Sequence, residues 1–136
     1  MSLRFLLDTN IISETLRPAP KPSMLEKLHN YQDEIAIPAI VWHELWFGCY
    51  RLALSPRRTT IELYLRQVVA LLPILAYDQD AADWHANERA RLTSLGLPPP
   101  FADSQIAAIA ATNKLTLVTL NEKDYKIFQG LQVTAW

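Results

Sequence analysis

The sequence predicts a single α/β domain in which helices cover both faces of a parallel sheet. Its 136 residues suit one hydrophobic core, and half of them are apolar while a fifth are charged, as in folded globular domains. Short apolar runs alternate with helical segments along the chain, which is the order of elements that builds a parallel sheet. No repeat, low-complexity tract or linker divides the sequence, so we expect residues 1–136 to form one domain.

The first half of the chain begins with a buried strand. Arg4–Leu7 is an apolar run that stops at a polar Asp-Thr-Asn sequence, which indicates a strand followed by the start of a short helix. Three prolines between Arg17 and Pro22 end that helix, because a helix interior does not tolerate proline. The further elements expected in this half are a helix at Ser23–Asn30, a strand at Ile35–Ile37, helices at Pro38–Leu54 and Arg57–Ala70, and a weak strand at Pro73–Leu75.

The second half begins with an amphipathic helix at Asp78–Ser94, which ends near Gly96, as helices often do. One side of this helix carries Ala81, Ala82, His85 and Arg89. After the rigid triple proline we expect a small-residue helix at Ala102–Asn113, the clearest strand of the chain at Thr116–Leu120, a short helix at Glu122–Phe128 and a final strand at Gln132–Thr134.

Composition narrows the class of protein. The formal net charge of −1 shows no basic excess of the kind that marks many nucleic-acid-binding domains, so any such binding must be local. Cys49 is the single cysteine, which excludes an internal disulfide and suits a reducing compartment. The sequence has neither a secretory signal pattern nor an apolar run long enough to span a membrane. We therefore expect a soluble, cytoplasmic protein.

Asp8 directly follows the first expected strand. The carboxyl ends of strands in an open parallel sheet line the crevice where ligands bind, so an acid at this point is placed for chemistry. Capping of the helix that begins near Asn10 explains this aspartate equally well when it is taken alone, because aspartate is a preferred N-cap.

Glu44 and Asp103 are acids with apolar neighbours on their expected helices. A carboxylate on the same helix face as Val41 and Phe47 must find a cation or become protonated, and a buried pair with an arginine is the structural alternative for Glu44. Asp103 begins the alanine-rich helix, where its alternative role is again capping. Three such acids are harder to explain by structure alone than any one of them.

A polar turn after Thr116–Leu120 offers a fourth oxygen ligand from Asn121, Glu122 or Asp124, although an exposed turn explains Glu122 more simply. Oxygen ligands select hard cations such as Mg²⁺ or Mn²⁺, and no Cys and His grouping with zinc spacing competes. Clustered carboxylates repel one another unless divalent cations neutralise them, and such clusters serve phosphodiester cleavage. The sequence thus predicts phosphoryl-transfer chemistry at a metal site.

Four segments in this order and spacing carry a resemblance over nearly the whole chain: Leu6–Glu14 (LLDTNIISE), Ala39–Gly48 around Glu44, Ala102–Ala107, and Thr119–Asn121. The chain resembles a PIN-domain protein, specifically the VapC-like toxins of bacterial type II toxin-antitoxin modules. Its opening through Leu16, Arg17 and Pro18, and its end at Trp136, resemble the FitB branch of that group.

This resemblance implies a three-layer α/β/α PIN domain with a central parallel sheet of four to five strands. It also implies an endoribonuclease that depends on Mg²⁺ or Mn²⁺, is inhibited by a cognate antitoxin and is usually a homodimer. Asp8, Glu44 and Asp103 match the three core acids of the family motif, and Thr9 and Thr119 match the hydroxyl positions that support the site.

One departure concerns Asn121, which stands where several relatives have a fourth acid, although this substitution is common in the group. Asparagine supplies no charge, so the sequence leaves open whether one or two metal ions are held. Our hypothesis is that Asp8 and Asp103 bind the principal metal while Glu44 ligates it or acts through its bound water, so that single-stranded or loop RNA is cut.

Two sets of residues are candidates for contacts with partners. The basic residues available to neutralise RNA phosphates are Arg57, Arg58, Arg89, Arg91, Lys114, Lys123 and Lys126, each of which is by default a solvated surface charge. Trp42, Trp46, Phe47 and Tyr50 crowd the helix of Glu44, and helical spacing cannot bury all four. We expect part of this aromatic set to form an antitoxin groove or a dimer contact and the rest to pack in the core.

Two other functions compete with the ribonuclease. An aspartyl-phosphate phosphatase also begins with a strand and an aspartate, but it needs an acid two residues later, where this chain has Asn10. A catalytically weak PIN-fold regulator, which binds nucleic acid in complex with a DNA-binding partner, would keep the fold without the enzyme. Titration with metal ions distinguishes such a regulator from an enzyme.

Overall fold

A parallel five-stranded sheet runs through the centre of the computed structural model, which describes residues 2–136. All four pairs of neighbouring strands are parallel. In spatial order the strands are β3 (Ile74–Leu75), β2 (Ile35–Pro38), β1 (Phe5–Leu7), β4 (Thr116–Val118) and β5 (Val133–Thr134). The predicted α/β class and parallel sheet are therefore confirmed.

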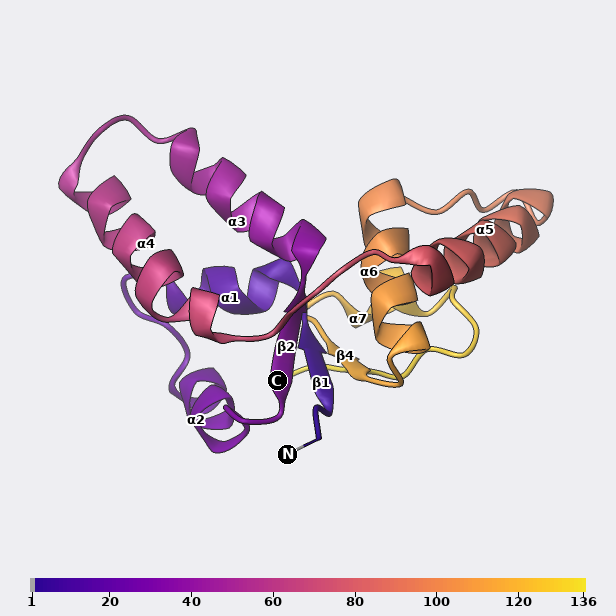
Figure 1. Ribbon diagram of the computed structural model, residues 1–136, viewed down its shortest axis with the longest axis horizontal. Coiled ribbons are helices and arrows are strands. Elements are labelled where there is room, and N and C mark those ends of the chain that lie inside the picture. The colour runs from indigo at the N-terminus through magenta and orange to yellow at the C-terminus, as the bar shows by residue number, and fades with distance from the viewer. Residues whose placement is uncertain (1) are drawn as a thin grey trace.

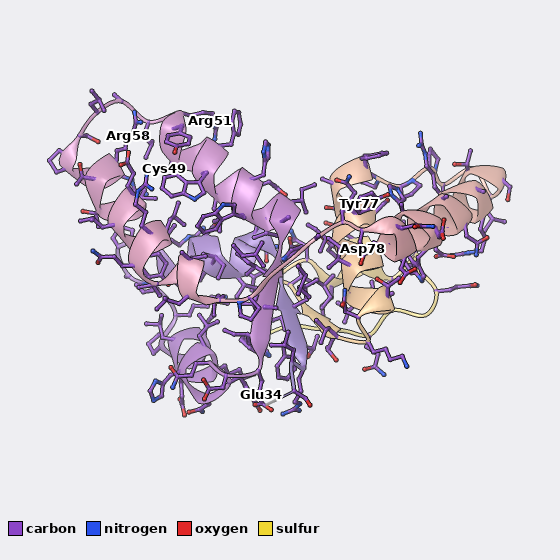
Figure 2. The ribbon with its side chains drawn as sticks, viewed as in Figure 1. Glu34, Cys49, Arg51, Arg58, Tyr77 and Asp78 are labelled. Carbon is purple, nitrogen blue, oxygen red and sulfur yellow. The ribbon has the colours of Figure 1, made fainter. Side chains whose placement is uncertain are left out.

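Helices cover both sides of this sheet (Figure 1), as the three-layer prediction requires. One side carries α1 (Thr9–Thr15), α2 (Pro22–Asn30), α3 (Ala39–Tyr50), α4 (Pro56–Gln67) and the short 3-10 helix η1 (Val69–Leu71). The other side carries α5 (Gln79–Ser94), α6 (Phe101–Thr112) and α7 (Glu122–Tyr125). The chain passes between the two sides near Tyr77 and Asp78, just before α5 begins (Figure 2).

The core lies where the central strands meet the helices. Leu6 and Leu7 of β1 and Leu117 of β4 are completely buried. The small side chains of α6 are buried as well, which lets the backbone of this helix pack closely against its neighbours. Among the helices described over residues 2–136, none is both long and apolar enough to cross a membrane.

The boundaries of two predicted helices on the first side are wrong. The helix expected at Pro38–Leu54 begins at Ala39, because Pro38 is the last residue of β2, where it pairs with Leu75. This helix also ends earlier than expected, at Tyr50. The helix expected at Arg57–Ala70 ends at Gln67, and Val68, inside the expected range, is half exposed.

Three predictions for the second half also need correction. The strand expected to reach Leu120 ends at Val118, and the helix expected to reach Phe128 ends at Tyr125. On α5, Ala81 and His85 are buried as expected, but Arg89 is exposed and Glu88 is buried instead. The cause is an ion pair that covers the charge of Glu88, so a charged residue takes part in the inner face of this helix.

The topology by itself brings three loops together. The strand order reverses at β1, with β2 and β3 on one side of it and β4 and β5 on the other. Crevices in open parallel sheets form at the carboxyl ends of the strands beside such a reversal. Asp8 follows β1 at this point, α3 with Glu44 follows β2, and Thr119 follows β4.

Candidate metal centre

Asp8 is held by three separate parts of the chain. It is the N-cap of α1, where its Oδ1 accepts a hydrogen bond of 2.7 Å from the backbone N–H of Thr9. Its Oδ2 accepts hydrogen bonds from the hydroxyls of Thr119 at 2.9 Å and Tyr125 at 3.2 Å, residues that lie 111 and 117 positions later. The capping role is therefore real, but it uses only one of the two carboxylate oxygens.

Thr119 connects the loop after β4 to the loop after β1. Its buried hydroxyl donates to Asp8 and accepts from the backbone N–H of Asn121 at 3.1 Å and from the Asn10 side chain at 3.3 Å. The side-chain oxygen Oδ1 of Asn10 in turn accepts a hydrogen bond from the backbone N–H of Leu120 at 3.1 Å. These bonds explain why a threonine and an asparagine suit these two positions: each acts as donor and acceptor at once.

Asp103 faces Asp8 from the first turn of α6. Pro100 is the N-cap of that helix, so the alternative capping role of Asp103 is not what the structure has. Its Oδ1 accepts a hydrogen bond of 3.4 Å from the hydroxyl of Tyr125. Burial and the charge of Asp8 raise the pKa of Asp103, and the Tyr125 hydrogen bond offsets part of that rise.

Glu44 approaches the same place from the middle of α3 and is half-buried. Burial, followed by the charges of Asp8 and Asp103, raises the pKa of Glu44. The Thr9 hydroxyl lies near Glu44 and offsets part of this rise in the pKa. The buried Oγ1 of Thr9 nevertheless makes no hydrogen bond of regular geometry. Over residues 2–136 no arginine or lysine forms an ion pair with Glu44, so the structure does not contain the buried pair considered as its alternative.

The three acids act on one another electrostatically, but they do not form a ready-made ligand set. Within the described part of the chain, no three His, Cys, Asp or Glu side chains are arranged to hold a metal ion together. The Tyr125 hydroxyl stands between Asp8 and Asp103 instead. The donor set still fits a hard cation, because it consists of oxygens, and burial together with unneutralised charge raises two carboxyl pKa values.

The residues of the polar turn contribute unequally to this site. Asn121, Glu122 and Asp124 are all exposed. The Asn121 backbone bonds Thr119, whereas its side chain makes no capping hydrogen bond to α7. The charge of Asp124 adds to the rise in the pKa of Asp103, so Asp124 acts on the cluster although it was only a secondary candidate.

Sequence reasoning missed Tyr125, which is buried and bonds two of the three acids. It stood in the prediction only as part of a final helix. An aromatic residue directly after an acidic turn is a weak signal, because the same pattern marks ordinary core packing. Nothing local indicates that its hydroxyl would meet two carboxylates.

Two of the candidate phosphate-binding arginines already have partners. Arg58 pairs with Glu62 at 2.9 Å, and Arg91 pairs with Glu88 at 2.7 Å. Arg58 also lies at the end of the α3–α4 arm that is remote from the sheet, as Figure 2 shows. These contacts favour structural roles for both residues.

The aromatic set of α3 divides as expected. Trp46 is buried and Trp42 is partly buried, whereas Phe47 and Tyr50 are more than half exposed. The exposed ring of Phe47 stacks on His43, with centroids 6.3 Å apart, and neither side chain enters the core. The expectation that helical spacing leaves part of this set outside the core is confirmed.

Comparisons with known proteins agree with this architecture. Residues 5–129 match the PIN domain. The tRNA(fMet)-specific endonuclease VapC of Shigella flexneri is 29% identical over 134 residues, which cover 98% of each chain. Toxin FitB of Neisseria gonorrhoeae is 32% identical over 120 residues, covering 84% of this chain and 85% of FitB.

Solved structures extend the likeness to three dimensions. DNA-bound VapBC from Salmonella typhimurium superposes with a TM-score of 0.87 at 27% identity, covering 98% of both chains. FitAcB from Neisseria gonorrhoeae superposes with a TM-score of 0.82 at 30% identity, covering 95% of both chains. Both likenesses extend over nearly the full length of the chain, so the whole architecture is shared and not one motif alone.

Proposed function

Because this chain belongs to the PIN-domain family, we propose that it is a divalent-metal-dependent endoribonuclease that acts as the toxin of a type II toxin-antitoxin module. The observation that carries this proposal is the cluster of Asp8, Glu44 and Asp103 at the carboxyl edge of the sheet, where no basic side chain of residues 2–136 pairs with any of them. Relatives that match this chain along 98% of their own length are named as an endonuclease and a ribonuclease, which supports the proposal.

Asp8, Glu44 and Asp103 would hold the ion, which we propose to be Mg²⁺ or Mn²⁺. When bound, such an ion supplies a Lewis acid that lowers the pKa of a bound water and stabilises the leaving oxygen of a phosphodiester. Carboxylates that burial and mutual repulsion hold at a raised pKa gain most from its positive charge, as Glu44 and Asp103 would.

The remaining work falls to side chains of this chain. Thr119 and the Thr9 backbone N–H fix both oxygens of Asp8, so this carboxylate needs little reorganisation when it meets a ligand. Glu44 is half-buried, and burial raises its pKa, which makes its carboxylate a stronger base. One oxygen of Glu44 is therefore the proposed acceptor of the proton that the attacking water loses.

We propose RNA as the substrate, with a transfer RNA as the first one to test. Two relatives from enteric bacteria are named tRNA(fMet)-specific endonucleases. The cluster lies at the edge of the sheet and Glu44 is half-buried, so an accessible phosphodiester in a loop or single strand is the form of RNA that suits it.

An antitoxin and a second copy of this chain are the proposed protein partners. Structural neighbours include VapBC and FitAB complexes on DNA. Phe47 and Tyr50 of α3 are more than half exposed and, together with Trp42 and Trp46, line one open surface hollow. A contiguous apolar patch of this kind is typical of surfaces that a partner covers. Light scattering with and without a co-expressed antitoxin measures both associations, and a monomer that binds no such partner would contradict this part of the proposal.

The test of the enzyme is RNA cleavage by the purified protein. We expect cleavage in Mn²⁺ or Mg²⁺, none in EDTA and none in Ca²⁺, and we expect Asp8→Asn to abolish it. Wild-type protein that binds Mn²⁺ but cuts no RNA would favour the alternative, a catalytically weak regulator that binds nucleic acid with a DNA-binding partner. Full activity of Asp8→Asn would refute the site.

A further inference from the structure

Tyr125 bonds two acids that belong to different elements. Its hydroxyl lies 3.2 Å from Oδ2 of Asp8, at the end of β1, and 3.4 Å from Oδ1 of Asp103, in α6. The residue is 2% exposed, and its ring packs against Phe128 with centroids 6.1 Å apart. The core therefore fixes the ring, and the ring fixes where the hydroxyl stands.

The two aspartates depend on this hydroxyl to different degrees. Asp8 also accepts hydrogen bonds from Thr9 and Thr119, so it keeps its position without Tyr125. Asp103 accepts no other hydrogen bond to its side chain from any residue in the range 2–136. Tyr125 is therefore the protein donor that sets the orientation of the Asp103 carboxylate.

We propose that Tyr125 is a positioning residue for the metal-binding carboxylates. Its hydroxyl engages Oδ1 of Asp103 and Oδ2 of Asp8, which also accepts from Thr119. A divalent cation would then bind Oδ2 of Asp103 and the remaining lone pair of Oδ1 of Asp8, which accepts one hydrogen bond, from the Thr9 N–H. This inference rests on the proposed metal site, but it concerns a residue outside the three acids.

The chemistry of a phenol suits this role. The single proton of the neutral hydroxyl is shared between the two carboxylate oxygens, at 3.2 and 3.4 Å. The hydroxyl orients both carboxylates without adding charge, so it does not neutralise them as a cation would. A phenol is protonated at neutral pH, so the Tyr125 hydroxyl remains a donor beside the carboxylates. Partners that orient metal ligands in this way typically contribute a factor of about 10 to 100 in metal affinity.

The experiment measures Mn²⁺ binding to the purified full-length protein by calorimetry, without RNA, for the wild type and Tyr125→Phe. Phenylalanine keeps the buried ring and removes only the hydroxyl. We expect an affinity about tenfold weaker, at the lower end of the range for such partners. We also expect the RNA cleavage rate to fall at limiting Mn²⁺ and to recover at saturating Mn²⁺, which loss of fold would not produce.

Two further variants make the outcome specific. Tyr64→Phe removes a hydroxyl that accepts a hydrogen bond from Thr15 away from the acids, and we expect it to leave Mn²⁺ affinity unchanged. Asp8→Asn should abolish binding. An affinity of Tyr125→Phe within twofold of the wild type, with binding lost in Asp8→Asn, would overturn the positioning role while the metal site stands. A wild type that binds no Mn²⁺ would overturn both.

Discussion

Glu88, a buried carboxylate, and the partly buried carboxylates Glu44 and Asp103 have opposite surroundings in this protein. Glu88 of α5 receives two hydrogen bonds from Arg91, at 2.7 and 2.8 Å, and one from the backbone N–H of Gln129 at 2.9 Å. The Arg91 hydrogen bond is the main reason why the pKa of Glu88 is lowered. In the metal centre, burial and neighbouring acids raise the pKa values of Glu44 and Asp103.

The difference separates a structural acid from acids that suit the proposed metal site. Glu88 ties α5 to the segment before β5, because its partner Arg91 also bonds the Ile127 carbonyl at 2.8 Å. All of its charge is neutralised inside the protein. The metal centre keeps its negative charge without an internal cation, which is costly to a fold unless a ligand neutralises it. Local sequence does not separate the two cases, since each acid lies on a helix near apolar residues.

The largest expected effect comes from removing one charge of the metal centre. Asp103→Asn keeps an oxygen that accepts from Tyr125 but loses the anion, so we expect RNA cleavage to fall at least about 100-fold. Because a repelled charge is removed, the melting temperature of the metal-free protein should stay equal or rise. Cleavage assays and thermal melts in EDTA measure both effects. A clear loss of stability would mean that Asp103 is structural like Glu88.

Glu88→Gln should give the reverse pattern. The amide keeps the shape but loses the charge-assisted bonds to Arg91, so we expect the melting temperature to fall by about 5 °C. The cleavage rate at 20 °C should stay within about twofold, because Glu88 does not touch the acids of the centre. Circular dichroism and the same cleavage assay test this. A large loss of cleavage in folded Glu88→Gln would contradict the purely structural role of Glu88.

The pH dependence of stability should differ in sign between the two groups. The folded-state pKa of Glu44 lies above its ordinary 4.5, so its contribution to stability is full at low pH and is lost as pH rises through the folded pKa. The folded-state pKa of Glu88 lies below 4.5, so its contribution is present at higher pH and is lost as pH falls.

Thermal melts of Glu44→Gln and Glu88→Gln in EDTA test this sign. Compared with the wild type, Glu44→Gln should have a higher melting temperature at about pH 8. The two proteins should melt at the same temperature at about pH 3, because Glu44 is then protonated in both the folded and the unfolded protein. Glu88→Gln should melt lower at about pH 8, and the gap should narrow on acidification. Parallel pH profiles of the two variants would contradict opposite surroundings.

Among the residues of the candidate metal centre, the smallest effect on RNA cleavage is expected at Asn121. Its backbone supports Thr119, but its side chain is exposed and carries no charge. Asn121→Ala should therefore lower cleavage by less than about tenfold, below the effect of the core acids. Asn121→Asp adds a charge that could attract a second ion, so a steeper dependence of the rate on Mn²⁺ concentration is its expected signature. A loss in Asn121→Ala as large as that in Asp103→Asn would place this side chain among the metal ligands.

The sequence by itself determined the fold class and the places of the acids. Alternation of apolar runs and helical segments requires a parallel sheet, and each of the loops that follow β1, β2 and β4 must then open at one edge of it. Asp8 follows from that rule, because the end of β1 can be found from local composition, whereas Thr119 was expected inside its strand and follows it instead. The helix ends at Tyr50 and Gln67 were missed, because the C-caps, Arg51 and Val68, carry none of the residue types that mark a helix end in a sequence.

Only the tertiary structure decided which carboxylates are neutralised. Glu88 was absent from the predicted inner face of α5 because its partners include the backbone of Gln129, 41 residues away. Tyr125 reaches Asp8 across 117 residues by a bond of 3.2 Å. Hydrogen bonds and ion pairs act over a few ångströms, so the environment of each acid depends on chain segments that local pattern does not place.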